Sequence, residues 1–378
     1  MTKKDGRTAD VILASSATSR DLFYATKVRV PDPILFFRVS GRKYLVASDL
    51  EIGRMREQAT VHHVLPLTKF RKRLVKAGNA NPSVTDIAIA VLTEKRIRTA
   101  RVPHDFPVFT ADRFRRAGIR VRPTEAPFWP ERTTKSTGEI EAIRAAAILT
   151  GEAIEAGIDL IRRSKPVRGL LRRDGKPLTS ERVRLEIDRA LMERGLRGEN
   201  TIVAGGEDGV DPHNVGSGPL KSGYPVILDV FPESQASGYH ADISRTVFRG
   251  RPSKRQREMW DAVLEAQALG CEMTKPGVAG KTIHAAIQKV FRDRGFETGP
   301  VNGKMQGFFH GTGHGLGLDV HEPPFFSASA APLEPGMVIT IEPGLYYPGV
   351  GGIRIEDDVA VTKDGHDNLV PLEKTFVV

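Results

Sequence analysis

The sequence contains a single cysteine, Cys271, among 378 residues. One cysteine forms no intramolecular disulfide, so a disulfide-stapled scaffold is excluded and a reducing compartment is favoured. The surrounding LEAQALGCEM has a helical pattern, which predicts a buried structural thiol rather than a nucleophile.

Long hydrophobic runs are also missing. No run of about 18 apolar residues occurs, so no transmembrane helix is expected. The only apolar run near the N-terminus is VILA, which is too short for the core of a signal peptide. With 40% hydrophobic and 27% charged residues, the composition is that of a globular protein. We therefore expect a cytoplasmic protein that does not associate with membranes.

The chain has a net charge of +10, from 56 basic and 46 acidic residues. The basic clusters RFRRAGIRVR, RRSKPVRGLLRRDGK and RPSKRQR are scattered and lack interleaved aromatic residues. They match no nucleic-acid-binding motif, so we interpret them as solvated faces and loops and expect no nucleic-acid partner.

The chain is long enough for two domains. Residues 1–130 alternate strand and helix patterns, which predicts an α/β domain. Within it, PILFFRVSGRKYLVAS indicates two strands around a Ser-Gly turn. A helix is expected over DLEIGRMREQ with Asp49 as N-cap, and another after Ser83. The segment APFWPERTTK, with two prolines, reads as a linker.

Residues 134–378 combine long helices with strands that suggest antiparallel hairpins, which predicts an α+β rather than a doubly wound domain. Ser136 and Glu139 fit a capping box at the first helix. The basic span 164–178 reads as a loop. Further helices are expected over SERVRLEIDRALMERG, QREMWDAVLEAQALGCEMT and AGKTIHAAIQKVFRDRG, and strands over TIVAGG, YPVILDVF, GYHADISRTVFR, MVITIEPGLYY and IRIEDDVAVT.

The stretch FFHGTGHGLGLDVHE, residues 308–322, places His310, His314 and His321 among alternating glycines. Glycine weakens helices and strands but lets the backbone bend and approach other groups closely. Histidine binds metals and titrates near neutral pH. The stretch therefore fits a metal site or a proton-transfer site; the alternative is a glycine-rich loop whose histidines cap turns.

Carboxylates stand at the ends of several otherwise apolar strand patterns. Buried carboxylates are unfavourable unless they are paired or bind metal. Oxygen donors with an imidazole and no thiolate suit divalent ions, and four carboxylates match the charge of two such ions. Two ions would share a bridging hydroxide, a nucleophile at neutral pH. The four carboxylates are Asp229, Asp242, Glu342 and Glu356, and Asp357 directly follows the last of them.

Together these motifs resemble the dinuclear metallopeptidases of the pita-bread fold, which include prolidase, aminopeptidase P, methionine aminopeptidase and creatinase. The resemblance covers nearly the whole chain: a creatinase-type N-terminal domain over residues 1–130 and a pita-bread catalytic domain over 134–378. It rests on DVF…GYHADISRT, HGTGHGLGLDVHE, ITIEPGLY and GGIRIEDDVAV, in the order the family has them.

The resemblance implies a role for each site residue. Asp242 and Glu356 would bridge the ions, with Asp229 on one ion and His314 and Glu342 on the other. Glu342 would also move a proton, and His213, His310 and His321 would act on the substrate. Tyr346 and Arg354 would orient the ligands. His284 and His366 match no motif position and are expected in surface or core roles.

Two departures from the family pattern concern the acidic hairpin. Asp229 and Asp242 stand two residues further apart than is common, with Phe231-Pro232 in place of the usual glycine, and Ser244 stands where threonine is usual. We expect the insertion to change the turn beyond the site rather than the ligands.

The resemblance implies hydrolysis of the Xaa-Pro bond by a hydroxide held between two divalent ions. The N-terminal domain argues against methionine aminopeptidase, and the full ligand set argues against creatinase. An Xaa-Pro dipeptidase (prolidase) is the first expectation, aminopeptidase P acting on longer peptides the alternative, and a non-catalytic binding protein a remote third. A homodimer and manganese are implied, with cobalt or zinc as alternative metals.

Overall fold

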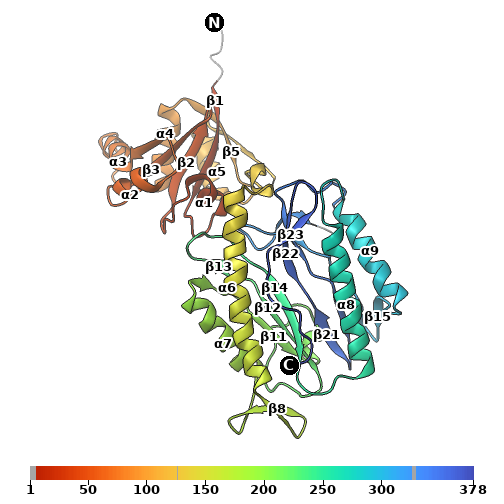
Figure 1. Ribbon diagram of the computed structural model, residues 1–378. Coiled ribbons are helices and arrows are strands. Elements are labelled where there is room, and N and C mark those ends of the chain that lie inside the picture. Colours follow the sequence, from red (N-terminus) through yellow and green to blue (C-terminus); the bar gives the residue numbers. More distant parts are fainter. Residues whose placement is uncertain (1–5, 126, 326–328) are drawn as a thin grey trace. The chain divides into compact units, whose positions relative to one another are not determined.

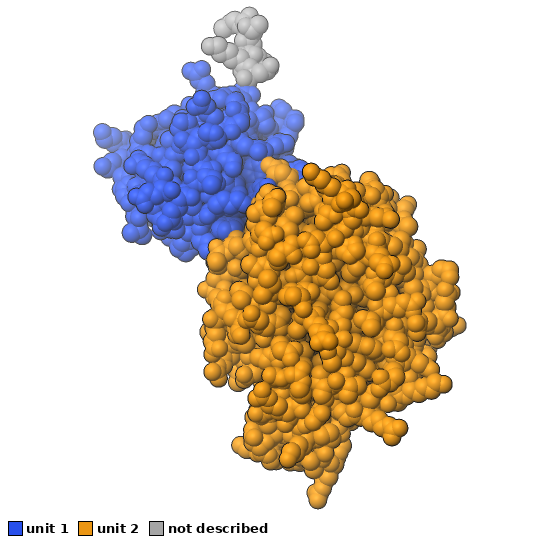
Figure 2. Space-filling model, viewed as in Figure 1, with its two compact units in different colours: residues 1–130 blue, residues 131–378 orange. Residues whose placement is uncertain are grey.

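The computed structural model describes residues 6–125, 127–325 and 329–378. The chain divides into two compact units, residues 1–130 and 131–378, which Figure 2 shows in different colours. The boundary falls within APFWPERTTK. Within the described ranges, no helix combines the length and apolar character needed to cross a membrane.

The described residues of the first unit form a six-stranded mixed sheet in the order β4-β3-β2-β1-β5-β6 and five helices. β1 pairs antiparallel with β2 and parallel with β5. The strands are β1 (Arg7–Ala14), β2 (Ile34–Val39), β3 (Arg42–Ala47), β4 (His63–Pro66), β5 (Ile97–Val102) and β6 (Arg120–Pro123). The helices are α1 (Arg20–Thr26), α2 (Ile52–Gln58), α3 (Leu67–Lys76), α4 (Val84–Glu94) and α5 (Val108–Arg116).

Both faces of this sheet are covered. Successive side chains of a strand point to opposite faces, and Phe36 and Phe37 accordingly lie in two different buried clusters. β2 and β3 flank a turn with positive φ at Ser40 and Gly41, as predicted. Ser83 caps α4 in a capping box, also as predicted.

One predicted cap is wrong. α2 begins at Ile52 with Glu51 as its N-cap, not with Asp49. The Asp49 carboxylate instead accepts a hydrogen bond from the Thr68 hydroxyl at 2.6 Å. A tertiary partner has therefore replaced the local backbone amides.

In the second unit, two helix pairs flank antiparallel strands (Figure 1). α6 (Thr137–Arg162) and α7 (Ser180–Glu193) contact the sheet of β11 (Ile202–Gly205), β12 (Pro225–Val230) and β14 (Ile243–Phe248). α8 (Lys254–Met273) packs on the strands that follow, with α9 (Gly280–Asp293) beside it. Ser136 and Glu139 form the expected capping box at α6, and Cys271 is buried in α8.

The C-terminal strands form a five-stranded sheet, β18-β17-β19-β22-β23, and a β20-β21 hairpin. These elements are β17 (His314–Gly315), β18 (Glu322–Phe325), β19 (Val338–Ile341), β20 (Gly344–Tyr347), β21 (Gly351–Arg354), β22 (Asp357–Val361) and β23 (His366–Asn368). Two further pairs of short strands are β10 (Leu196–Arg197) with β13 (Glu233–Ser234), and β15 (Gly299–Val301) with β16 (Lys304–Gln306).

The basic span 164–178 is not a loop. It forms a three-stranded antiparallel sheet of β7 (Lys165–Val167), β8 (Leu170–Arg173) and β9 (Lys176–Pro177). Two tight turns with positive φ, at Arg168-Gly169 and Asp174-Gly175, join its strands. The turn residues could be recognised in the sequence. The many basic residues between them gave no apolar pattern, so the short strands were interpreted as a loop.

The contact between α6 and α7 depends on a glycine. A Cβ at Gly157 would lie 2.6 Å from Cγ1 of Ile187. Ile187 is fully buried, so the overlap has little room to relax. Gly138 lies in the same helix, and a Cβ there would meet nothing within 4 Å.

We predict opposite effects for alanine at these two positions. Gly157→Ala should destabilise the protein by about 1–3 kcal/mol through overpacking, although alanine is the better helix former. Gly138→Ala should be neutral or stabilise by up to about 1 kcal/mol. Thermal unfolding of the two variants measures the contrast, and an unchanged melting temperature for Gly157→Ala would contradict the close packing.

Candidate metal centre

The acidic residues lie where strands end. Asp229 is the fifth residue of β12, paired with Ser244 of β14, and Asp242 directly precedes β14. Glu342 directly follows β19, and Glu356 lies between β21 and β22. Residues 231–242 form the connection between β12 and β14, so Phe231 and Pro232 lie outside the positions at which these two strands pair.

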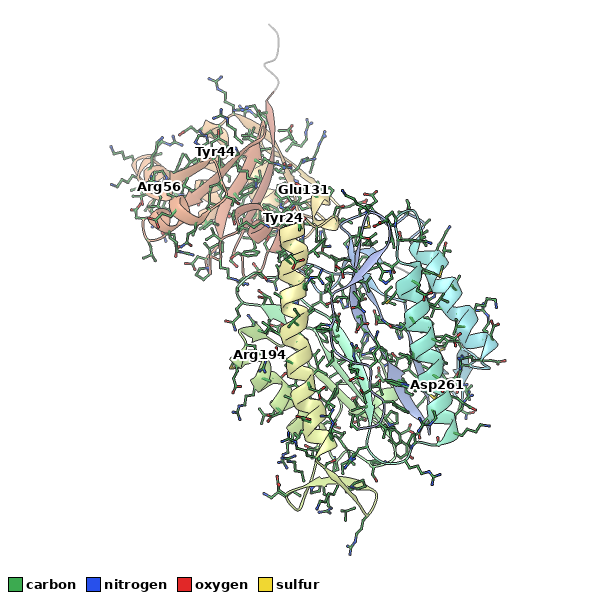
Figure 3. The ribbon with its side chains drawn as sticks, in the orientation of Figure 1. Tyr24, Tyr44, Arg56, Glu131, Arg194 and Asp261 are labelled. Atoms are coloured by element: carbon green, nitrogen blue, oxygen red, sulfur yellow. The ribbon has the colours of Figure 1, made fainter. Side chains whose placement is uncertain are left out.

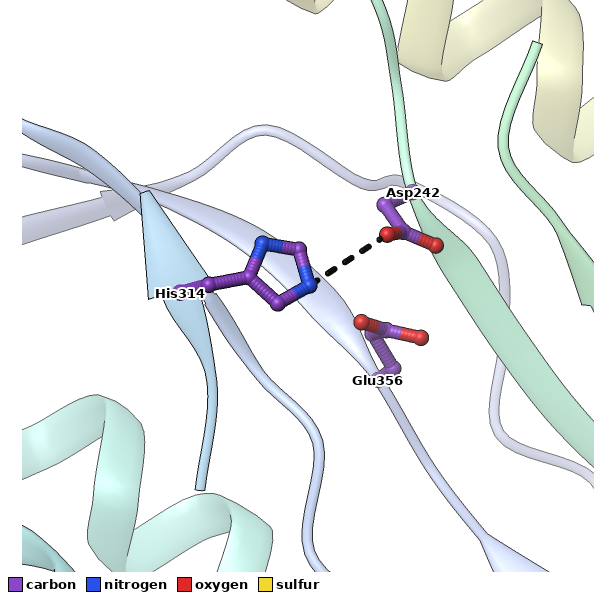
Figure 4. A group of neighbouring side chains, drawn as sticks. All are labelled: Asp242, His314 and Glu356. Carbon is purple, nitrogen blue, oxygen red and sulfur yellow. Dashed lines mark ion pairs between the residues drawn. The ribbon is translucent and has the colours of Figure 1, made fainter. Parts of the chain in front are cut away.

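Asp242, His314 and Glu356 meet in the interior of the second unit, and Figure 4 shows the imidazole of His314 turned toward both carboxylates. One donor atom from each of the three lies within 4.8 Å of the others. His314 Nε2 lies 3.7 Å from Asp242 Oδ2 and 3.6 Å from Glu342 Oε1. Three carboxylates therefore surround one imidazole nitrogen.

The orientation of His314 is set by its backbone. Its Nδ1 lies 3.2 Å from the carbonyl oxygen of Gly315, to which it donates in the neutral tautomer. Nε2 is then left with its lone pair facing the carboxylates. The preceding Gly313 lies against β19, where a Cβ would come within 1.9 Å of the Thr340 carbonyl oxygen. The glycine is therefore needed for this close backbone contact.

Burial raises the pKa of the clustered acids. The pKa values of Asp242 and Glu356 lie well above their usual range, first because of burial and then because of neighbouring carboxylates. Burial also raises the pKa of Glu342 to about 7. It lowers the pKa of His314 to about 4, so this imidazole is neutral at neutral pH. The cluster thus retains protons unless a cation takes their place.

The donor set fits divalent metal ions. Carboxylate oxygens with one neutral imidazole are ligands that manganese, cobalt and zinc accept. Asp229 Oδ1 is buried, and no hydrogen-bond partner for it occurs among the described residues. An ion bound beside Asp229 would satisfy this oxygen, because its other oxygen already accepts a hydrogen bond from Arg354.

Arg354 links the two sides of the cluster. Its Nη2 donates to Asp229 Oδ2 at 2.5 Å, and its Nε donates to the Ser244 hydroxyl at 2.9 Å. Ser244 in turn donates to Glu356 Oε2 at 2.8 Å. One guanidinium and one hydroxyl therefore orient two of the predicted metal ligands.

Tyr346 and His310 continue this network. Arg354 Nη1 donates to the Tyr346 hydroxyl at 3.0 Å, and that hydroxyl lies 2.9 Å from His310 Nε2. Burial raises the pKa of Tyr346 to about 12 and lowers the pKa of His310 to about 3. Both are therefore neutral at neutral pH, which suits a hydrogen bond from the tyrosine hydroxyl to the imidazole.

A cavity of about 740 Å³ opens onto the cluster. Besides the acids and His314, its wall includes His213, His310 and His321, the three histidines predicted to face a substrate, and Arg354. The ring of His321 lies edge-on to His314, with 4.2 Å between centroids. Apolar surface comes from Ile202, Val215, Phe231, Phe309, Val320 and Phe325.

The sequence did not indicate several residues that form hydrogen bonds to the segments of the site. His284 was expected in a surface or core role, but its Nδ1 lies 2.8 Å from the Thr312 hydroxyl, inside the histidine stretch. The carbonyl of Thr312 accepts from the Glu342 amide at 2.8 Å. Asp358 accepts from the Asp242 amide at 3.1 Å. The neighbouring Asp357, named among the strand-end acids, pairs instead with buried Arg245 at 2.7 Å.

Fold and site together define a pita-bread protein with a carboxylate-rich centre for divalent metal. Residues 141–363, more than half of the chain, match metallopeptidase family M24. The chain belongs to this family.

Relatives and solved structures agree with this assignment. The chain is 42% identical over 179 residues to an uncharacterized peptidase of Bacillus subtilis, covering 47% of this chain and 48% of the relative. It is 33% identical over 250 residues to the Xaa-Pro dipeptidase of Pyrococcus furiosus, covering 65% of each chain. The matches thus span between about half and two thirds of these curated relatives.

Among solved structures, an Xaa-Pro dipeptidase from Bacillus anthracis superposes with a TM-score of 0.82 at 25% identity. The match covers 98% of this chain and 95% of that one. The fold of both units is therefore shared with a two-domain enzyme of known structure.

We predict that metal binding displaces protons. Below about pH 7 the Glu342 carboxyl is largely protonated in the ion-free protein, and the raised pKa values of Asp242 and Glu356 act in the same direction. The apparent affinity for Mn²⁺ should therefore rise between about pH 5 and about pH 7. Calorimetry in buffers of different ionisation enthalpy counts the protons released. Glu342→Gln should release fewer, and an affinity that falls with rising pH would contradict the raised pKa values.

We also predict that Asp242→Ala abolishes metal binding and the thermal stabilisation that Mn²⁺ confers, because it removes a carboxylate central to the cluster. Asp261→Ala is the matched control, since Asp261 is an exposed carboxylate on α8 (Figure 3). Metal content by mass spectrometry and melting with and without Mn²⁺ give the readout. Full metal loading of Asp242→Ala would remove this residue from the ligand set.

Proposed function

We propose that the protein hydrolyses the peptide bond before proline, as an Xaa-Pro dipeptidase (prolidase) that depends on two divalent metal ions. The observation that carries this proposal is the meeting of Asp242, His314 and Glu356 beside Glu342 on the wall of the 740 Å³ cavity. The Pyrococcus furiosus relative, an Xaa-Pro dipeptidase, supports the proline specificity.

The chain supplies enough donors for two ions, which Asp229, Asp242, His314, Glu342 and Glu356 would hold. Such ions would lower the pKa of water and polarise the scissile carbonyl, with manganese proposed and cobalt or zinc as alternatives. The buried carboxylate oxygens of the cluster need this added positive charge. Among the residues described on the cavity wall, Arg354 is the one arginine or lysine, and its single charge does not balance the carboxylates.

Glu342 is suited to move the proton. Its carboxylate lies on the cavity wall, 3.6 Å from His314 Nε2, and a carboxylate placed beside the reacting groups can take up and release a proton. The nitrogen of proline leaves as a secondary amine and must be protonated when the bond to the carbonyl carbon breaks. Glu342 accepts the proton of the attacking water and delivers it to this nitrogen.

The histidines of the cavity act on the substrate. Burial lowers the pKa of His321, so its ring is neutral at neutral pH and donates through one N–H. We assign this hydrogen bond to the oxygen of the attacked carbonyl, where negative charge develops. His213, across the cavity wall, contacts the leaving part of the substrate, and His310 fixes the Tyr346 hydroxyl beside Arg354.

One observation favours aminopeptidase P as the second candidate. A dipeptide places its C-terminal carboxylate in the cavity, and a cation there would stabilise it. Arg354 is already paired with Asp229 at 2.5 Å and bonded to Ser244 and Tyr346, so its charge is not offered to a substrate. Longer peptides place no carboxylate at this position.

We also propose a cytoplasmic homodimer, as the sequence resemblance implies. Light scattering would test the dimer.

The test is hydrolysis by the Mn²⁺-loaded protein, with Ala-Pro timed beside Ala-Pro-Ala and with Ala-Ala as the control. Cleavage of Ala-Pro, with Ala-Ala intact, supports the dipeptidase. Cleavage of Ala-Pro-Ala alone supports aminopeptidase P. If neither proline peptide is cut while metal is bound, Xaa-Pro hydrolysis is wrong, and the metal site has another substrate or none.

A further inference from the structure

An ionic cluster whose central groups are buried lies outside the metal centre, with one half-exposed carboxylate at its edge. It comprises Arg132, Lys135, Asp319 and Glu322, here called the Glu322 cluster. Lys135 Nζ donates to Glu322 Oε1 at 2.7 Å, and Arg132 Nη2 donates to Glu322 Oε2 at 2.7 Å. Lys135, Arg132 and Glu322 are only 6%, 7% and 5% exposed. Two cations from the segment before α6 thus enclose one carboxylate.

Glu322 is tied to the loop that carries His321. This loop, residues 316–321, joins β17 to β18, and Glu322 pairs with Gly315 at its base. A Cβ at Gly317 would lie 2.5 Å from Glu322 Oε1, so the carboxylate packs directly against the loop backbone. Arg132 also donates to Asp319 Oδ2 at 2.7 Å, which connects the tip of the loop to the same cluster.

The cluster is not explained by stability alone. Burying ionised groups costs desolvation free energy, and replacing such a group with apolar residues is often neutral or stabilising. The Glu322 cluster has a specific geometric effect, because its two cations fix both Asp319 and Glu322, which lie on either side of His321 in the sequence. His321 is exposed to the cavity, so the position of its ring depends on the backbone that carries it.

We propose that Glu322, anchored by Lys135 and Arg132, is a positioning residue for His321. It holds the loop so that the imidazole stays beside His314 and within reach of the substrate carbonyl. This inference rests on the proposed function, since the role of His321 belongs to that reaction. Glu322 itself touches neither the substrate nor a metal ligand in this assignment.

The first test is Glu322→Gln, which keeps the shape of the side chain and removes its charge. We expect kcat on the peptide that the wild type cleaves to fall about 10- to 100-fold, with Mn²⁺ stoichiometry unchanged. The matched control is Asp367→Asn, which also converts a carboxylate paired with arginine, here the exposed pair with Arg144 at 2.7 Å. Its kcat should equal that of the wild type. Loss of metal from Glu322→Gln would overturn the proposal.

A double-mutant cycle separates positioning from general stability. If Glu322 acts through His321, Glu322→Gln should cause almost no further loss of kcat in a His321→Ala background. Additive losses in the two backgrounds would overturn the proposal. Where Glu322→Gln does not fold, Lys135→Met replaces it in the cycle, because Glu322 then keeps its pair with Arg132. Lys135→Arg should restore most of the activity, since it restores the charge.

A spectroscopic readout makes the inference independent of turnover. In protein with isotope-labelled histidine, the ring resonance of His321 is identified by its loss in His321→Ala. We expect this resonance to shift or broaden in Glu322→Gln and to remain unchanged in Asp367→Asn. An unchanged resonance in Glu322→Gln would overturn the positioning role. If the wild type cleaves no Xaa-Pro peptide, the proposed function fails, while this measurement still decides whether Glu322 positions His321.

Discussion

The repulsion among buried carboxylates is the constraint on which the catalytic unit depends. Asp229, Asp242, Glu342 and Glu356 gather in the interior, where charge is costly, and the chain gives them one arginine and no ammonium group on the described cavity wall. The raised pKa values of Asp242, Glu342 and Glu356 are the direct expression of this imbalance. Protons relieve it in the ion-free protein, and divalent ions relieve it in the proposed enzyme. The centre is thus organised around positive charge that it must acquire from outside.

Rigid neighbours are needed to hold such a cluster together. Arg354 donates to Asp229 through Nη2 and to Ser244 through Nε. Because Ser244 donates to Glu356, one guanidinium orients two acids from separate parts of the chain. Asp358 and Thr312 fix the backbone next to Asp242 and Glu342 through single amide hydrogen bonds. The Glu322 cluster serves the same purpose for the loop of His321. Positions within strands or directly beside their ends keep these groups from moving apart in response to their repulsion.

Much of this arrangement could be predicted from the sequence, for identifiable reasons. Apolar runs that end in Asp or Glu, such as VILD and VITIE, indicate both the strand and the unusual residue at its end. The capping boxes at Ser83 and Ser136 are local signals, and the structure confirms both. The Asp49 cap failed because Thr68, distant in sequence, competes for that carboxylate. His284, Arg132 and Lys135 were not recognised because their partners lie 28 to 190 residues away.

The division of the chain near residue 130 has a consequence for how the protein can vary. The residues found on the cavity wall fall between Asn200 and Glu356, entirely within the second unit. The first unit has its own two-sided core, which packs around residues such as Phe36 and Phe37. Substitutions in that core alter the first unit without removing a metal ligand. The reactive centre and the N-terminal core therefore use different stretches of the chain, and a substitution in one leaves the residues of the other unchanged.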